Sequence, residues 1–148
     1  MTNYDWSGNM KKLYYATVTY VVLGLAFGVF YREFTKINEY TDPTMLSGVH
    51  SHLISLGFMF FLILTLTAAS SRLTEHKSFN KWFIVYNVGL LWTTITMAIR
   101  GVLEVKGSDI PGFNHMAGTG HTILAVALVW FVIMLKKVLF SSKVKASV

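Results

Sequence analysis

Polar and apolar positions alternate along this chain in long blocks rather than in short periods. Four blocks contain no Lys, Arg, Asp or Glu, and they cover residues 13–31, 43–71, 82–99 and 110–135. A helix that crosses a bilayer needs about 20 mostly apolar residues. We therefore predict four transmembrane helices, at about 13–31, 46–69, 82–103 and 115–136.

The polar segments between these blocks are short, which limits how the helices can be arranged. Short connections make neighbouring helices antiparallel, so we predict an all-α, integral membrane four-helix bundle of up-down-up-down topology, with residues 1–148 as one domain. The letters TDPT at 41–44 predict the start of the second helix, with Thr41 or Asp42 as its cap. Gly24 and Gly28 form a GxxxG pair, which predicts close helix packing within the bundle.

The composition agrees with a membrane protein. Hydrophobic residues make up 53% of the chain and charged residues only 14%, whereas a soluble domain carries about 25% charged residues. The chain has no cysteine, which excludes disulfides, cysteine-ligated iron–sulfur clusters and cysteine-attached haem.

The net charge of +6 is divided between the two ends of the predicted bundle and does not indicate a nucleic-acid partner. Nine of the 13 cations fall on the side that holds both termini and the connection between the second and third spans. Because cationic loops stay in the cytoplasm, this asymmetry predicts that both termini are cytoplasmic.

Four of the five histidines lie near the starts of the second and fourth spans: His50, His52, His115 and His121. These two spans run in the same direction, so all four side chains are expected near one membrane face, the outer one. Ionisable side chains within membrane spans are costly and commonly functional. This cluster is therefore the candidate functional site.

Depth and helical phase favour one pair within the cluster. His121 precedes Lys136 by 14 intervening residues, or about 21 Å of helix, so it must lie inside a hydrocarbon core about 30 Å thick. His52 shares a helical face with Gly48, and His121 with Gly118, small residues that suit a bundle interior. His50 is about 200° around the helix from His52, so we expect His52 and His121 to face each other, with His50 as the second choice.

Such a pair suits haem. We expect the second and fourth spans to be diagonal partners, about 11–14 Å apart, which leaves space for a flat macrocycle whose iron is bound from both sides. Arg32 and Arg100 end the first and third spans at the same end, and arginine binds carboxylates such as the haem propionates in a bidentate fork. Three glycines are expected to leave room for the ring, namely Gly48, Gly118 and Gly120.

The leading hypothesis is thus a cytochrome b-like protein that binds haem b through the iron ligands His52 and His121, for electron transfer, haem sensing or haem handling. Two axial histidines leave no open position at iron, which argues against an enzyme. A redox partner or quinone, and a homo-oligomer or membrane complex, are compatible with this hypothesis. Two alternatives stay open, a copper or zinc site formed by the four clustered histidines and a cofactor-free accessory subunit of a respiratory complex.

Four stretches carry a resemblance to known proteins: LGLAFGVFYREFTK, GVHSHLISLGFMFFLIL, YNVGLLWTTITMAIRG and GTGHTILAVAL. They resemble a family of small bacterial four-span membrane proteins classed as a domain of unknown function, over nearly the whole chain. The resemblance implies a multi-pass protein of the bacterial cytoplasmic membrane and supplies no mechanism.

A more distant resemblance is to haem-bearing helical bundles. The halves of haem A synthase have four helices with histidines on the second and fourth, and HSHLISLG is similar to histidine-led second helices in relatives of the haem–copper oxidases. This resemblance implies that His50 or His52, together with His121, would bind haem. The chain lacks the acidic residue that the synthases place beside their histidine, which argues against synthase chemistry.

Overall fold

The chain folds into helices joined by short connections. The computed structural model describes residues 8–108 and 110–141, and these residues contain helices and no strands, which confirms the all-α prediction. The second span is built from three consecutive helical segments, of which the middle one is a π-helix. In chain order the elements are α1 (Gly8–Ile37), α2 (Leu46–His52), the π-helix η1 (Leu53–Met59), α3 (Phe60–Ala68), the short 3₁₀ turn η2 (Leu73–Glu75), α4 (Phe79–Val105) and α5 (Phe113–Ser141).

Four of these helical stretches are long and apolar enough to cross a membrane: Gly8–Ile37, Leu46–Ala68, Phe79–Val105 and Gly118–Phe140. Their outward faces carry many exposed large apolar side chains, for example Val22 at 59%, Leu66 at 66% and Val129 at 61%. Contiguous apolar surface on this scale marks contact with a membrane or a partner rather than with water. The four helical stretches therefore fit a multi-pass membrane protein.

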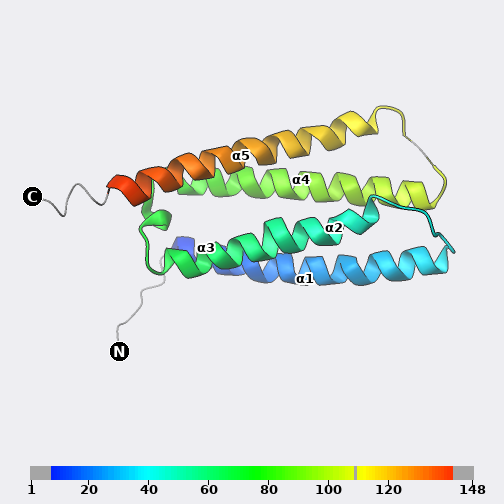
Figure 1. Ribbon diagram of the computed structural model, residues 1–148, viewed down its shortest axis with the longest axis horizontal. Helices are drawn as coiled ribbons and strands as arrows, with labels where there is room; N and C mark the ends of the chain where they lie inside the picture. The colour runs from blue at the N-terminus through cyan, green and yellow to red at the C-terminus, as the bar shows by residue number, and fades with distance from the viewer. Residues whose placement is uncertain (1–7, 109, 142–148) are drawn as a thin grey trace, which may run out of the picture.

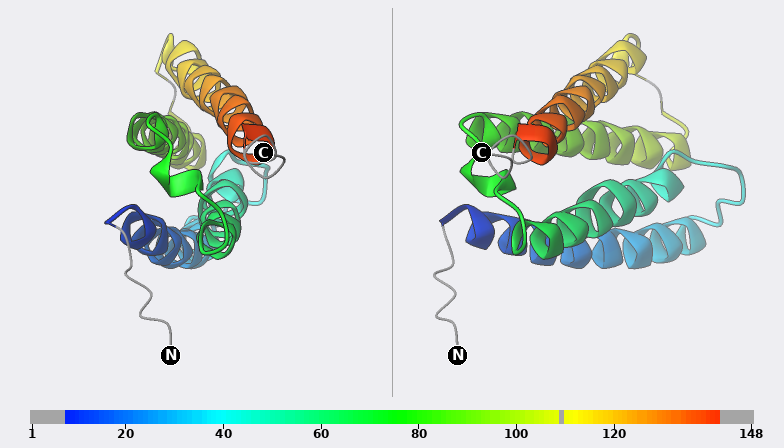
Figure 2. Two further views of the ribbon diagram at one scale, coloured as in Figure 1. Left: turned by 90° about the vertical axis from the view of Figure 1, so that its left-hand side faces the viewer. Right: turned by 60° about the vertical axis from the view of Figure 1, so that its left-hand side comes forward.

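The four spans run lengthwise through the molecule, as Figure 1 shows, and α5 is inclined to the other three in the views of Figure 2. Successive spans run in opposite directions, and the start of α1 lies at the same end of the molecule as the end of α5. The left view of Figure 2, along the bundle, shows α1 and α3 on one side of the molecule and α4 and α5 on the other. Aromatic side chains join the two sides, since Phe60 of α3 meets Phe131 of α5 with centroids 5.4 Å apart.

The second and fourth spans thus meet through their side chains. Their backbones pack most closely on other helices, the second span on α1 and α4 and the fourth span on α4. The connection after α3 is part of this packing. Leu73 and Thr74 in this connection are buried, and the Thr74 carbonyl accepts a hydrogen bond from Asn9 of α1. The connection thus packs across the end of the bundle and carries the chain over to α4.

An aromatic cluster fills the half of the bundle nearer this connection. Tyr86 lies at its centre and stacks on Phe60 with ring centroids 4.7 Å apart. Its hydroxyl donates to the Leu56 carbonyl (2.8 Å), and the Trp82 indole donates to the Ala127 carbonyl (3.0 Å). Aromatic pairs of this kind stabilise a core beyond the area that they bury, so this half of the bundle is firmly packed.

Glycines let the helices approach closely at several levels. A Cβ on Gly24 would lie 2.6 Å from the Ile54 side chain, so the GxxxG pair packs within the bundle as predicted. On α5, a Cβ on Gly120 would lie 2.9 Å from the Thr93 backbone nitrogen of α4. Small residues are what membrane helices use for such close contact.

Candidate functional site

The second span changes its helical geometry next to the histidines. From Leu53 to Met59 it is a π-helix, and the Phe60 N–H bonds to the Ser55 carbonyl. Gly57 lets the Tyr20 side chain of α1 pack directly against this segment, because a Cβ at Gly57 would lie 2.6 Å from Cγ of Tyr20. A π-helix has more residues per turn than an α-helix, and such segments are frequent at functional sites. Here it sets the helical phase between His52 and the aromatic cluster.

The structure brings His52 and His121 together. Their ring centroids are 5.9 Å apart and their planes are nearly perpendicular, at 88°. His52 is half-buried and His121 is exposed on the surface of the bundle. The two rings come from different spans, so their contact depends on how α2 and α5 are each held.

A backbone carbonyl fixes which nitrogen of His52 carries the proton. Its Nδ1 lies 2.8 Å from the Gly48 carbonyl oxygen, and since a carbonyl only accepts, Nδ1–H is the donor. The lone pair of the neutral ring is then on Nε2. Histidines that bind metals commonly donate their other N–H in this way, which orients the ring and raises its basicity.

His50 belongs to a different interface. Its Nδ1 donates to the Gly24 carbonyl of α1 (2.7 Å), and its ring covers Gly28, where a Cβ would lie 3.0 Å from the same nitrogen. His50 therefore joins α1 to α2 and does not lie with the His52–His121 pair, as its helical phase predicts.

The other histidines lie apart. His115 is exposed near the start of α5, and His76 accepts a hydrogen bond from the Ser78 N–H in the connection before α4 (3.2 Å). Within residues 8–108 and 110–141, no three His, Asp or Glu side chains are grouped so that they could hold a metal ion. The four-histidine copper or zinc site is thus not assembled there.

The two arginines are not equivalent. The Arg32 side chain is 79% exposed and lies 3.6 Å from a Glu33 carboxylate oxygen. The Arg100 side chain is only 34% exposed, and its Nε donates to Glu104 Oε1 (2.9 Å). Arg100 is therefore paired with a carboxylate one turn further along α4.

The structural role of the Glu104 carboxylate was not predicted from the sequence. Its second oxygen accepts from the Met45 N–H (2.7 Å) and lies 3.0 Å from the Thr44 hydroxyl. Thr44 Oγ1 in turn accepts from the Leu46 N–H (3.2 Å). Thr44 and Glu104, rather than the expected Thr41 or Asp42, cap the second span, because the chain enters the helix only at Leu46 and a carboxylate from α4 reaches its free N–H groups.

Replacing Glu104 with alanine should lower the free energy of unfolding by about 1–2 kcal/mol, because a cap and a charge-assisted hydrogen bond are lost. The measurement is thermal or denaturant unfolding of the detergent-purified protein. Glu33→Ala is the matched control, since the Glu33 side chain is 48% exposed and pairs with the exposed Arg32, and exposed ion pairs contribute little. Equal destabilisation by both variants would contradict the capping role.

Of the three glycines expected to leave room for a ring, only one is open. Nothing lies within 4 Å of a Cβ built on Gly118. Gly48 is covered by the Met97 methyl group (2.6 Å) and Gly120 packs against Thr93 of α4. At Gly120 the packing of α4 uses the space that the missing side chain leaves, whereas at Gly48 the end of the flexible Met97 side chain occupies it.

The fold and the site are those of a small all-α protein with four helices long and apolar enough to span a membrane, and with a histidine pair between the second and fourth of them. Residues 10–138 match the family model described as protein of unknown function (DUF2871), so the chain belongs to that family. No curated protein and no solved structure matches the chain. The distant likeness to haem-bearing bundles such as haem A synthase gains no support from these comparisons.

Proposed function

We propose that this protein binds one haem b in the membrane through His52 and His121, for electron transfer, haem sensing or haem handling. The observation that carries the proposal is the spacing of the two rings. Metal–imidazole bonds are about 2 Å long, so two rings on opposite sides of one metal have centroids roughly 6 Å apart. The His52 and His121 centroids are 5.9 Å apart.

Two further observations support the fit. The Gly48 carbonyl holds His52 in the tautomer whose Nε2 can bind iron. Beside His121, the surface at Gly118 is open, so a planar group can reach the pair from the side of the bundle. Bound there, haem would supply one-electron redox chemistry, and this chain would supply the axial nitrogens and the apolar surroundings that tune it.

Of the two arginines, Arg100 is the better candidate to face a propionate. It is partly buried and oriented by Glu104, whereas Arg32 projects into the surroundings. In this proposal the Glu104 carboxylate offsets part of the Arg100 charge, so the arginine orients the propionate more than it neutralises it.

An absorption spectrum tests the proposal. Protein purified in detergent from cells supplied with a haem precursor should show a low-spin spectrum that sharpens on reduction with dithionite, and pyridine haemochrome analysis should identify haem b. If the protein is colourless and contains stoichiometric copper or zinc, the haem proposal is wrong and the copper or zinc alternative is favoured. Colourless, metal-free protein that co-purifies with a larger complex would favour an accessory subunit.

We also propose that the protein spans the bacterial cytoplasmic membrane with both termini in the cytoplasm, although the terminal residues 1–7 and 142–148 lie outside the described residues. The charge asymmetry supports this orientation. The cationic side is the end of the bundle that holds Lys11, Lys12, Arg72, Lys77, Lys81, Lys136 and Lys137.

Cysteine labelling in intact cells should show this orientation, because the chain has no native cysteine. A membrane-impermeant maleimide should label Glu39→Cys without cell lysis and Lys77→Cys only after lysis. The reverse pattern would place the histidine pair toward the cytoplasm and overturn the proposed orientation.

A further inference from the structure

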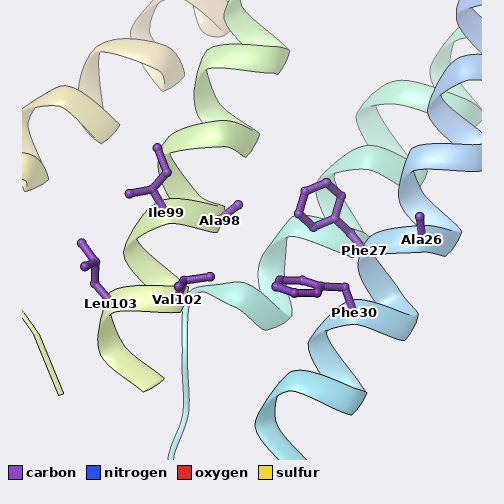
Figure 3. Close-up of a pocket in the computed structure, with 7 residues that line it drawn as sticks. All are labelled: Ala26, Phe27, Phe30, Ala98, Ile99, Val102 and Leu103. Atoms are coloured by element: carbon purple, nitrogen blue, oxygen red, sulfur yellow. The ribbon is translucent and has the colours of Figure 1, made fainter. Parts of the chain in front are cut away.

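Two pockets lie one after the other along the seam between α1 and α4. One, of about 480 Å³, lies toward the histidine end, where Phe27 and Phe30 of α1 reach toward Ala98 and Val102 of α4 (Figure 3). The other, of about 330 Å³, lies toward the opposite end, and its lining includes Lys12. We call the second one the Lys12 pocket, whose lining is Lys12, Tyr15, Ala16, Thr19 and Tyr20 of α1 with Phe83, Asn87 and Leu91 of α4.

The two pockets differ in chemistry. The first is lined only by apolar side chains, whereas the Lys12 pocket has a cation at one end. Lys12 Nζ donates to the amide oxygens of Asn80 (2.6 Å) and Asn9 (3.2 Å), which are neutral. Within the described ranges no carboxylate lies within salt-bridge distance of Lys12. Its charge is therefore held in place and not neutralised there.

The rest of the Lys12 pocket suits hydrocarbon. Tyr20 donates to Asn87 Oδ1 (2.6 Å) and Asn87 donates to the Phe83 carbonyl (2.7 Å), so these polar groups are satisfied by the protein. Lys12 and Tyr20 are eight residues apart on α1, or about 12 Å. One leaflet of the hydrocarbon core is about 15 Å thick, so the pocket matches the depth of one leaflet.

We propose that the Lys12 pocket binds an anionic phospholipid, with its phosphate at Lys12 and one acyl chain along Ala16, Tyr20 and Leu91. Basic pockets between membrane helices bind such head groups. The charge also argues against a second copy of the chain as the occupant. A two-fold dimer places the same patch on both sides of the interface, so two Lys12 side chains would face each other. This inference does not depend on haem binding.

Lipid titration of the purified protein tests the head-group contact. Phosphatidylglycerol should stabilise the delipidated wild-type protein more than phosphatidylcholine with the same acyl chains, as measured by thermal unfolding in detergent. Lys12→Gln should weaken the apparent affinity for phosphatidylglycerol about fivefold, the effect of one cation near a membrane surface. Lys11→Gln is the matched control, because Lys11 is an exposed neighbour that does not line the pocket. Equal effects of the two variants, or no preference for phosphatidylglycerol, would overturn the proposal.

A second pair of variants tests the acyl-chain contact. Thr19→Phe fills the Lys12 pocket and should weaken binding of phosphatidylglycerol, whereas Ala26→Phe fills the apolar pocket and should leave it unchanged. Light scattering tests whether a second copy of the chain occupies the pocket instead. If the protein is a dimer, Thr19→Phe disrupts that dimer and no lipid is preferred, the seam between α1 and α4 is a dimer interface and the lipid proposal is overturned. If Thr19→Phe does not fold, the comparison of Lys12→Gln with Lys11→Gln decides alone.

Discussion

His121→Ala should abolish the low-spin haem spectrum, and His52→Ala should do the same. In the haem proposal each substitution removes one of the two nitrogens that would hold the iron, and within residues 8–108 and 110–141 no third histidine is grouped with the pair. A five-coordinate, high-spin haem or complete loss of haem is the expected result. The measurement is the reduced-minus-oxidised spectrum of protein purified at equal yield, with haem content determined as the pyridine haemochrome.

Two other histidines serve as controls for this result. His115→Ala should leave the spectrum unchanged because the side chain is exposed and apart from the pair. His50→Ala should also keep the low-spin spectrum but lower the unfolding temperature, because the bond to the Gly24 carbonyl is lost. If His52→Ala keeps the spectrum and His50→Ala loses it, their roles are exchanged. Normal spectra in both His52→Ala and His121→Ala would refute the haem proposal.

Gly101→Ala should destabilise the protein by about 1–3 kcal/mol, the usual effect of overpacking. A Cβ at this position would lie 2.7 Å from the Leu46 Cα and clash with the Leu46 backbone nitrogen. Backbone atoms cannot rotate away, so the start of the second span must move off α4. The same movement separates Thr44 and Met45 from the Glu104 carboxylate, so the cap weakens as well.

A glycine-to-alanine substitution at Gly118 should instead raise the free energy of unfolding. At Gly118 nothing lies within 4 Å of a built Cβ, so Gly118→Ala should stabilise the protein by up to about 1 kcal/mol through helix propensity alone. Unfolding of both variants in the same detergent gives the comparison. A neutral effect of Gly101→Ala would mean that α2 does not pack on α4 as described.

Much of this fold could be predicted from the lengths of the charge-free blocks. The thickness of the bilayer sets the length that a spanning helix needs. Four apolar helices can therefore be predicted without knowing which residues are in contact. The facing of His52 and His121 was predicted from helical phase, and the two rings are in contact. The phase argument also separated His50, which contacts α1 instead.

The arrangement of the helices around the bundle could not be predicted in this way. The packing of the connection that holds the buried Leu73, for example, leaves no periodic pattern in the sequence. What packs against Gly48 and Gly120 could not be predicted for a related reason. A glycine in a membrane span indicates close approach, but its neighbours in sequence do not show whether a ligand or another helix makes that approach.

The third span, α4, carries no histidine, but both helices that carry the histidine pair pack against it. Gly101 sets how near α2 lies to α4, and Gly120 sets how near α5 lies to the same helix. The distance between His52 and His121 therefore depends on two separate contacts with α4, one made by α2 and one made by α5. If haem binds as proposed, a single methyl group added at Gly101 or at Gly120 would move one of the two histidines relative to the other, and the haem spectrum would change before the haem was lost.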